Sequence, residues 1–518
     1  MAFLGTIVNK VVDAVPLLKP TLADQVRQSD LPLKAKELDL GLIGSTDDFD
    51  NAVCAFGPDA NDTVYVAKHS RRLDGLSHSC GCVVKEVRLP PLRQLPVPQG
   101  RTGSTLSRPD FLQEWMRHMM PSINNLSLWD LCLPGTHDTL TYDLSDCPAK
   151  HDTIPDLGPL NEEPLKRVAM PELRKLCACQ TIDIDAQLDA GIRFLDIRVI
   201  YSDSRSRWVG VHGMETKQEA VFYLKRIHDW LRAHSSEIVV LWFSRHGNEE
   251  ATGHDQYPHT PAEEKQKFYK QILDIFGNLV VEDGETFLKH VPIQCLVAED
   301  KRAVLICSDW DEFTGRSGSA MDGAQVLQNH LPGGFDDPVL DALRVFSRLS
   351  FDRSKFQLVS LANSADKGAV LKQFLPGLAR SAYGACSTVS GVFGGSPLPS
   401  ISKFENVPGM TSNPWRLDDS ARFSNYHAQI VLDIVWKRCT LPQAIYIDMV
   451  TADGGIDIGN GQRFGYVDTI LAYNAVQSGD HDLLTNMMGR LHLMPVCRWE
   501  DRQNGRSEVW PLCSLGHH

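Results

Sequence analysis

Residues 127–140 read SLWDLCLPGTHDTL, and this stretch sets the interpretation of the whole chain. The apolar run Leu126–Leu133 predicts a buried strand, and the Pro-Gly dipeptide after it predicts a sharp turn. The turn presents a polar triplet that contains His137 and Asp138. A polar triplet at the carboxyl end of a strand lies where β/α enzymes keep their active sites. The alternative is a turn histidine that only bonds a backbone carbonyl.

Three further segments place polar residues on strand-like runs. In LDAGIRFLDIRVI, residues 188–200, Asp196 and Arg198 are two positions apart and therefore share one face of a strand. An Asp–Arg pair that faces inward must either form a structural ion pair or bind a ligand. The short strand VGVHG carries His212 near its end, and the apolar strand AIYIDMV is broken by Asp448. A buried Asp is costly unless it holds a hydrogen-bond donor such as a histidine.

These residue types fit the chemistry of phosphodiester cleavage. One histidine can remove a proton from the nucleophile, and the other can donate a proton to the leaving oxygen. A carboxylate can fix the tautomer of the base, and an arginine can neutralise the charge that grows on phosphorus.

Strand-like runs alternate with helical patterns from residue 109 onward. Such alternation indicates an α/β protein, either a β/α barrel or a doubly wound sheet. Helices are expected at Glu219–His234 and Pro261–Leu279 because of their apolar spacing and, in the second, acids in the first turn. Strands are expected at residues 126–133, 192–200, 209–212, 237–243, 303–307, 356–361 and 444–450.

The rest of the chain has a different composition. Residues 1–108 predict a small N-terminal extension domain that ends in a Pro-rich linker, and they carry no recognisable chemistry. Residues 376–425 are rich in Gly, Ser and Pro, which predicts an insertion that is a lid, a membrane contact or a disordered segment. Residues 479–518 are assigned to a C-terminal tail, which leaves 109–478 as the main domain.

Charge and hydropathy limit the partners. The net charge of −13 argues against nucleic acid as the main partner. No apolar run reaches the ~18–20 residues that a membrane span needs. The N-terminus lacks the features of a secretory signal, and its apolar stripe at residues 4–18 packs either on the protein or on a membrane surface. We therefore expect a cytoplasmic protein that meets membranes peripherally.

The chain has 13 cysteines, an odd number, without the spacing of a disulfide framework. Two pairs are close in sequence, Cys80-Gly-Cys82 and Cys177-Ala-Cys179. Zinc sites usually show a second such pair or added histidines at set distances. Free thiols in a reducing compartment are therefore expected.

Five segments, in their order along the chain, resemble the X domain of phosphatidylinositol-specific phospholipases C. They are LPGTHDT, QLDAGIRFLDIRV, VHG, EIVVLWFSR and AIYIDMV. The likeness is to the bacterial enzymes and to eukaryotic proteins that carry only an X domain, and it covers about residues 110–478. The resemblance implies a distorted TIM barrel. It also implies intramolecular attack on phosphorus, which releases diacylglycerol and leaves a cyclic inositol phosphate, at a membrane surface.

The resemblance implies a role for each matching residue. His137 resembles the general base that activates the inositol 2-hydroxyl, and Asp448 resembles the carboxylate that orients this base. His212 resembles the general acid that protonates the departing oxygen, and Asp138 resembles the acid that supports it.

Arg198, with Asp196 beside it, resembles the arginine that holds the phosphate. Calcium-dependent members of the family place an acidic ligand where this chain has Phe194, and an Asn ligand at the position of Asp138. A guanidinium and Ca²⁺ would repel each other in the same place. We therefore expect a mechanism without a cofactor, with Ca²⁺ as the less favoured alternative.

The headgroup contacts depart from the bacterial pattern. A basic residue ends the strand that matches EIVVLWF in those enzymes, whereas this chain has Ser244 there and Arg245 one step later. Arg245 is a candidate substrate-binding residue, and the headgroup preference stays open. Two alternatives follow, a catalytically weak X-domain protein that binds lipid or protein, and another phosphodiesterase on the same barrel. No motif indicates a protein partner.

Overall fold

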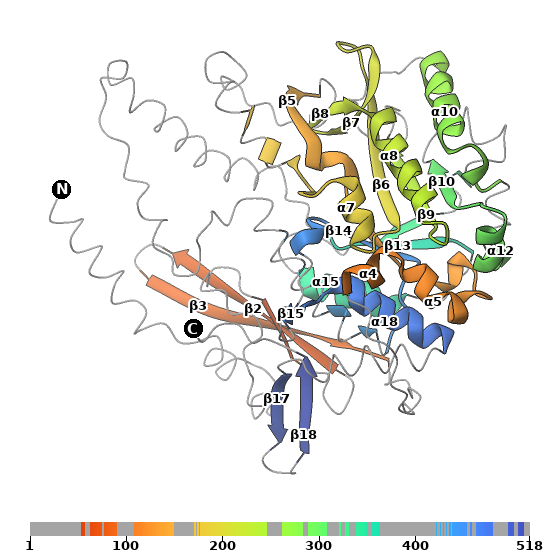
Figure 1. Cartoon of the computed structure of the whole chain (residues 1–518). Coiled ribbons are helices and arrows are strands. Elements are labelled where there is room, and N and C mark those ends of the chain that lie inside the picture. The colour runs from red at the N-terminus through yellow and green to blue at the C-terminus, as the bar shows by residue number, and fades with distance from the viewer. Residues whose placement is uncertain are drawn as a thin grey trace, which may run out of the picture. The chain divides into compact units, whose positions relative to one another are not determined.

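The computed structural model describes part of the 518 residues, as the coloured segments of Figure 1 show. The described residues are 53–56, 63–74, 77–90, 108–149, 170–171, 174–175, 177–245, 262–282, 289–307, 321–322, 327–330, 338–349, 354–362, 421, 425, 428, 431–432, 435–436, 438–452, 456–457, 463–479, 496–501 and 506–511. The predicted linker, most of the 376–425 insertion and the N-terminal apolar stripe lie outside them.

The chain divides into two compact units. The first comprises Met1–Pro90, Val407–Gly409 and Met494–His518, and the second comprises Pro91–Asn406 and Met410–Leu493. In the first unit, β1 (Val53–Phe56), β2 (Thr63–Asp74) and β3 (Ser77–Arg88) form an antiparallel sheet, and β17 (Val496–Asp501) pairs with β18 (Arg506–Pro511).

The second unit is built on an eleven-stranded sheet, most of it parallel (Figure 1). Its path runs β11-β10-β9-β6-β4-β14-β13-β12. The strands are β4 (Leu133–Thr136), β6 (Phe194–Ser202), β9 (Val239–Arg245), β10 (Ala303–Cys307), β11 (Met321–Asp322), β12 (Leu327–His330), β13 (Phe356–Ser360) and β14 (Ala444–Ile447).

The strand order follows the chain order, and β14 returns to pair with β4 in parallel. Within the described residues β11 and β12 do not pair, so the sheet is not closed between them. The predicted α/β class is confirmed, whereas a closed barrel is not. The carboxyl ends of β4, β6 and β14 meet at one edge, because these strands are parallel neighbours.

An antiparallel extension leaves this path. β7 (Arg207–His212) pairs with β6 and with β8 (Met214–Glu219), and β8 pairs with β5 (Leu144–Pro148). His212 therefore ends a hairpin strand and not a parallel strand of the main sheet. Gly213 makes the tight connection with a φ of 68°, a conformation that glycine adopts readily.

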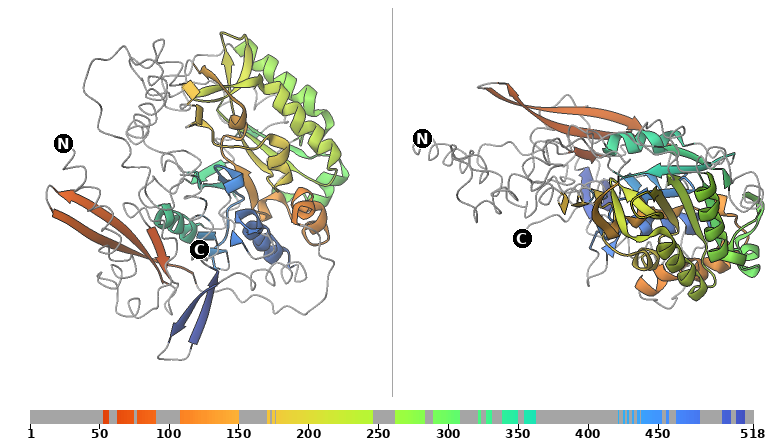
Figure 2. Two further views of the ribbon diagram at one scale, coloured as in Figure 1. Left: turned by 60° about the vertical axis from the view of Figure 1, so that its left-hand side comes forward. Right: turned by 90° about the horizontal axis from the view of Figure 1, so that it is seen from above.

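Amphipathic helices cover the sheet. In α8 (Ala220–Ala233) the buried residues are Ala220, Tyr223, Leu224, Ile227, Trp230 and Leu231, and their spacing of three and four forms one stripe. α8 packs against α7 (Ile184–Asp189) and α10 (Ala262–Phe276), as Figures 1 and 2 show, and it contacts β7 and β8. Within the described residues of this unit, the helices are α4 (Arg108–Gln113), α5 (Trp115–Ile123), α7 (Ile184–Asp189), α8 (Ala220–Ala233), α10 (Ala262–Phe276), α12 (Ile293–Ala298), α15 (Pro338–Arg348) and α18 (Tyr466–Ser478).

Single 3-10 turns occur at Leu128–Asp130, Thr139–Asp143, Gly277–Leu279 and Val450–Ala452, and the two-residue strands β15 (Ile456–Asp457) and β16 (Arg463–Phe464) pair with each other. None of the helices in the described part of the chain is long and apolar enough to cross a bilayer.

The prediction of a strand at Leu126–Leu133 is wrong. Ser127 and Asp130 form a turn instead, because the Asp130 carboxylate accepts from both the backbone N–H and the hydroxyl of Ser127 at 2.8 Å. This local bonding competes with a strand ladder. The strand β4 starts at Leu133 and includes the dipeptide that we expected to turn.

Gly135 has a packing role inside β4. A Cβ atom at this position would lie 2.9 Å from the Cβ of Tyr446 and 3.1 Å from Cδ1 of Phe194. The absence of a side chain therefore lets β4 sit between its neighbours β14 and β6. The sharp change of direction comes three residues later, at Asp138, whose φ is 45°.

A buried ion pair ties the first helices to the sheet. Arg193 and Glu237 are fully buried, and Arg193 Nη2 lies 2.6 Å from Glu237 Oε2. Glu237 also accepts from the backbone N–H of Arg117 at 2.9 Å, at the start of α5. Burial lowers the pKa of Arg193, and Glu237 counteracts this shift.

Glu237→Gln should lower the free energy of unfolding by about 3–5 kcal/mol, because it leaves a buried guanidinium without its counter-charge. Urea denaturation followed by circular dichroism measures this loss. The matched control is Glu263→Gln, which removes the exposed partner of Lys267 and should leave the transition unchanged. Equal shifts in the two variants would contradict the assigned role of the buried pair.

Candidate active site

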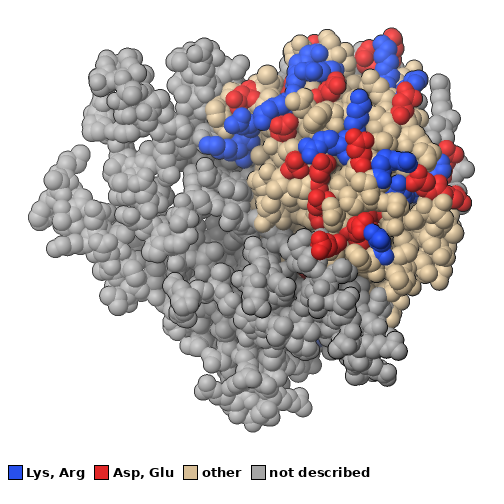
Figure 3. All heavy atoms as spheres, viewed as in Figure 1, with Lys and Arg blue, Asp and Glu red and all other residues tan. Residues whose placement is uncertain are grey.

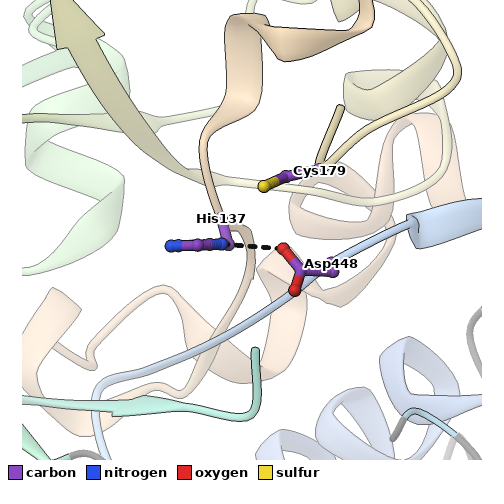
Figure 4. Close-up of side chains that lie close together, drawn as sticks. All are labelled: His137, Cys179 and Asp448. Atoms are coloured by element: carbon purple, nitrogen blue, oxygen red, sulfur yellow. Dashed lines mark hydrogen bonds and ion pairs between the residues drawn. The ribbon is translucent and has the colours of Figure 1, made fainter. Parts of the chain in front are cut away.

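His137 and Asp448 come from adjacent strand ends. β4 and β14 pair with Thr136 opposite Ile447, and each strand is followed directly by one of the two site residues. His137 Nδ1 lies 2.7 Å from Asp448 Oδ1, the contact drawn in Figure 4. Both side chains are buried. The two segments, more than 300 residues apart in the sequence, are thus joined at one point.

The neighbouring Arg198 assigns the tautomer of His137. Arg198 Nη2 lies 2.7 Å from His137 Nε2, and a guanidinium can only donate. Nε2 is therefore the acceptor, and Nδ1 carries the proton that is donated to Asp448. This places the lone pair of the imidazole on the side away from Asp448.

Arg198 is held by two carboxylates. Its Nε lies 2.6 Å from Asp138 Oδ1, and its Nη2 lies 3.0 Å from Asp196 Oδ2. Burial raises the pKa of Asp196, but Arg198, His137 and Ser244 lower it by more, so the net shift is downward. The pKa of Arg198 is raised, because Asp138 and Asp196 outweigh its burial. Arg198 and Asp196 therefore stay charged at neutral pH.

Asp138 lies between the two histidines. Its Oδ2 is 3.4 Å from His137 Nε2 and 3.6 Å from His212 Nε2, and the two imidazole ring centroids are 6.3 Å apart. The left-handed conformation of Asp138 directs its carboxylate into this space, and its N–H donates to Asp196 Oδ2 at 3.1 Å.

His212 reaches the site from the β7–β8 hairpin. Its Nδ1 lies 2.7 Å from the carbonyl oxygen of Cys177, so Nδ1–H donates and Nε2 faces Asp138. Its side chain is 30% exposed, compared with 11% for that of His137. Solvent and ligands therefore reach the pair of histidines from the side of His212.

The electrostatic surroundings of His137 favour its protonated form. Burial lowers its pKa, but the carboxylates of Asp138 and Asp448 raise it by more, and the net pKa lies above the ordinary 6.5. Arg198 acts in the opposite direction. His137 therefore gains basicity from its neighbours while it remains shielded from water.

The structure brings together six of the predicted site residues: His137, Asp138, Asp196, Arg198, His212 and Asp448. The seventh, Arg245, lies opposite Arg198 in the pairing of β9 with β6, and its side chain lies outside the described residues. Ser244 donates its hydroxyl to Asp196, so it supports the ion cluster.

Two buried amides that the sequence did not single out hold the strand ends in place. Gln180 Nε2 donates to the carbonyl oxygens of His137 and Ile447, both at 3.0 Å. Asn425 Nδ2 donates to the carbonyl oxygen of Asp448 at 2.7 Å. No local pattern marks either residue, because each bonds backbone from a distant segment.

The described donor set does not fit Ca²⁺. Calcium takes 6–8 oxygen ligands, whereas the carboxylates around Arg198 within the described residues, Asp138 and Asp196, each place an oxygen on the guanidinium, whose charge repels a cation. Phe194, at the position of a calcium ligand in the calcium-dependent enzymes, is a buried core residue.

The fold is that of an α/β protein. Its candidate site places two histidines, His137 and His212, next to the ion pair of Asp138 and Arg198. The resemblance to the X domain of phosphatidylinositol-specific phospholipases C is confirmed, because the family model PI-PLC X 1 matches residues 174–268. PI-PLC X domain-containing protein 1 is 29% identical over 194 residues in Mus musculus, which is 37% of this chain and 53% of that protein.

Two human relatives match this chain at comparable identity and over comparable shares of its length. PI-PLC X domain-containing protein 1 of Homo sapiens is 31% identical, over 33% of this chain and 51% of that protein. PI-PLC X domain-containing protein 3 of Homo sapiens is 27% identical, over 38% of this chain and 57% of that protein. This chain thus spans about half the length of the curated relatives that it matches.

Solved structures that resemble the fold include the phosphatidylinositol-specific phospholipase C of S. aureus. The TM-score is 0.42 at 14% identity, over 72% of this chain and 99% of that chain. The enzyme of the same description from Listeria monocytogenes gives a TM-score of 0.41 at 13% identity, over 71% of this chain and 98% of that chain.

Asp448→Asn should lower the pKa of His137, because it removes one of the two carboxylates that raise it. Proton NMR of the imidazole signals against pH measures the shift. The control Asp203→Asn changes an exposed carboxylate after β6 and should leave the titration unchanged. An unaltered His137 titration in Asp448→Asn would show that the observed contact does not set its basicity.

Proposed function

We propose that the protein is a phospholipase C-type phosphodiesterase that acts on an inositol glycerophospholipid at a membrane surface. Its products are diacylglycerol and a cyclic inositol phosphate. The observation that carries this proposal is the placement of Arg198 and Asp138 against two histidines whose rings are 6.3 Å apart. We further propose that the sheet forms a barrel with an open seam between β11 and β12.

His137 is the general base in this proposal. Its Nε2 takes the proton of the attacking inositol hydroxyl, and Asp448 stabilises the imidazolium that forms through their 2.7 Å contact. In the structure Arg198 occupies this Nε2 at 2.7 Å. The phosphate must therefore draw the guanidinium toward itself, which frees the lone pair as the substrate binds.

His212 is the general acid. In its protonated form Nε2–H gives its proton to the departing diacylglycerol oxygen, while Nδ1–H stays on the carbonyl of Cys177. Asp138 Oδ2 lies 3.6 Å from this Nε2, on the side from which the proton leaves. Arg198 balances the charge that develops on the phosphoryl oxygens, and we propose that no metal is required.

The approach to a lipid surface does not rest on a uniform charge. The chain carries a net charge of −13, and Figure 3 shows Lys and Arg interspersed with Asp and Glu over the face of the described residues. A mixed surface gives little long-range attraction to anionic lipid. We therefore propose apolar contact as the main anchor, and the 376–425 insertion, mostly outside the described residues, remains the predicted contact.

One contact favours a second candidate function, a lipid- or protein-binding module without turnover. The base Nε2 of His137 is blocked by Arg198 at 2.7 Å. If the bound ligand did not displace this guanidinium, the site would hold a phosphate without cleaving it.

With phosphatidylinositol vesicles and EDTA, wild-type protein should form a cyclic phosphate that phosphorus NMR detects. His137→Ala and His212→Ala should each lower the rate by about 10²–10⁴-fold, because each removes a proton-transfer step. The control His228→Ala changes a histidine of α8, outside the site, and should keep the wild-type rate.

Other outcomes of this assay decide between the proposals. Vesicle binding without turnover would reject the enzyme and support the binding module. A rate that appears only with added Ca²⁺ would overturn the metal-free mechanism.

A further inference from the structure

A thiol lies inside the candidate active site and has no part in the proposed mechanism. Cys179 is 1% exposed, and its Sγ is 3.6 Å from Asp138 Oδ2 and 3.5 Å from His212 Nδ1. Burial raises the pKa of this thiol well above its usual value, and Asp448 and Asp138 raise it further. Without a ligand Cys179 is therefore a neutral, unreactive group.

A cysteine, a histidine and an aspartate that converge are the usual ligands of zinc. The ligand atoms of Asp138, Cys179 and His212 all lie within 4.8 Å of one another. Two ligands of a tetrahedral zinc stand about 3.3–3.6 Å apart, from bonds of about 2.0–2.3 Å. Asp138 Oδ2 lies 3.6 Å both from Cys179 Sγ and from His212 Nε2. These distances already match two edges of the tetrahedron.

Two other groupings in the same cluster fit less well. His137, Cys179 and Asp448 also converge, as Figure 4 shows, but His137 Nδ1 and Asp448 Oδ1 are only 2.7 Å apart. That separation is a hydrogen bond, which an ion bound by both atoms would have to break. His137, Asp138 and Asp196 enclose Arg198, whose charge repels a cation.

The orientation of His212 supports the first grouping independently. Histidines that bind a metal usually donate their other ring N–H to a carbonyl or carboxylate. His212 Nδ1 makes this contact with the Cys177 carbonyl at 2.7 Å, which leaves Nε2 as the ligand atom. Its 30% exposed side chain gives an ion a path from solvent and leaves a fourth position open.

We propose that Asp138, Cys179 and His212 form a reversible Zn²⁺ site with an open fourth position. Binding releases the thiol proton to solvent, and the thiolate and the Asp138 carboxylate balance the charge of the ion. Arg198 stays on the opposite oxygen of Asp138, Oδ1. The thiolate selects zinc and excludes calcium, which prefers oxygen ligands.

Occupancy of this site would inhibit catalysis. Zinc on Nε2 of His212 removes the atom that would carry the leaving-group proton, and it holds the Asp138 carboxylate. The inhibition rests on the proposed function, whereas zinc binding itself does not. Only one cysteine of the Cys177-Ala-Cys179 pair takes part as a side chain, and the other contributes its carbonyl.

The test uses Co²⁺ as a spectroscopic substitute for Zn²⁺ in the full-length, EDTA-treated protein. Wild-type protein and Cys147→Ser, which changes an exposed thiol, should develop a thiolate-to-cobalt charge-transfer band at one equivalent. Cys179→Ser and His212→Ala should not, and isothermal titration with Zn²⁺ should show affinity reduced by more than about tenfold. Added Zn²⁺ should remove the cobalt band.

The metal-binding measurement tests the zinc site, and the activity measurement tests the proposed function, so each can be rejected without the other. A cobalt band in a protein without turnover would sustain the zinc site and remove the proposed function. The absence of any band or zinc isotherm in folded wild-type protein would overturn the site, as would a band retained in Cys179→Ser. A band lost in His137→Ala but kept in His212→Ala would move the site to the rejected grouping and overturn the proposal. In an active enzyme, zinc that inhibits Cys179→Ser as strongly as wild type would also overturn it.

Discussion

The site depends on the charge balance around Arg198. A buried guanidinium is stable only if carboxylates compensate it, and Asp138 and Asp196 do so from two directions at 2.6 and 3.0 Å. Asp196 is on the same strand, whereas Asp138 follows β4, so the ion cluster fixes one strand end against the other. The backbone N–H of Asp138 also donates to Asp196 Oδ2 at 3.1 Å, which links the two strand ends directly. The arrangement that neutralises the cation thus also sets the position of the first histidine.

The support of this cluster extends beyond charge. Gly135 allows β4 to lie between Tyr446 and Phe194, and Gln180 bonds the carbonyl oxygens that follow β4 and β14. Because both strands are parallel neighbours, their ends present His137 and Asp448 side by side. A phosphate that entered this edge would therefore meet groups held by the sheet and not by a mobile loop. Rigid support of this kind limits the reorganisation that proton transfer requires.

The features that could be predicted from the sequence are those that depend on the pattern of neighbouring residues. Alternation and polar breaks in apolar runs gave the α/β class and the six residues of the cluster, and β10 has the predicted bounds Ala303–Cys307. The same reasoning failed at Leu126–Leu133, where a Ser–Asp bond replaces the strand, and at the Pro-Gly dipeptide inside β4. The roles of Gln180 and Asn425 depend on backbone that is distant in sequence, so no local pattern could reveal them.

Cys179 shows how one carboxylate can serve two partners. Oδ1 of Asp138 faces the guanidinium and Oδ2 faces the thiol and His212. A carboxylate with both oxygens bonded to cations would bind a second cation weakly, but here the second oxygen faces the thiol of Cys179 and the imidazoles of His137 and His212. Loss of the thiol proton adds one negative charge at the point where a divalent ion would add two positive ones. The positive charge of Arg198 therefore does not exclude a metal ion from the whole site. It disfavours an ion with oxygen ligands, such as Ca²⁺, next to the guanidinium, whereas an ion that binds thiolate, such as Zn²⁺, can bind next to Cys179.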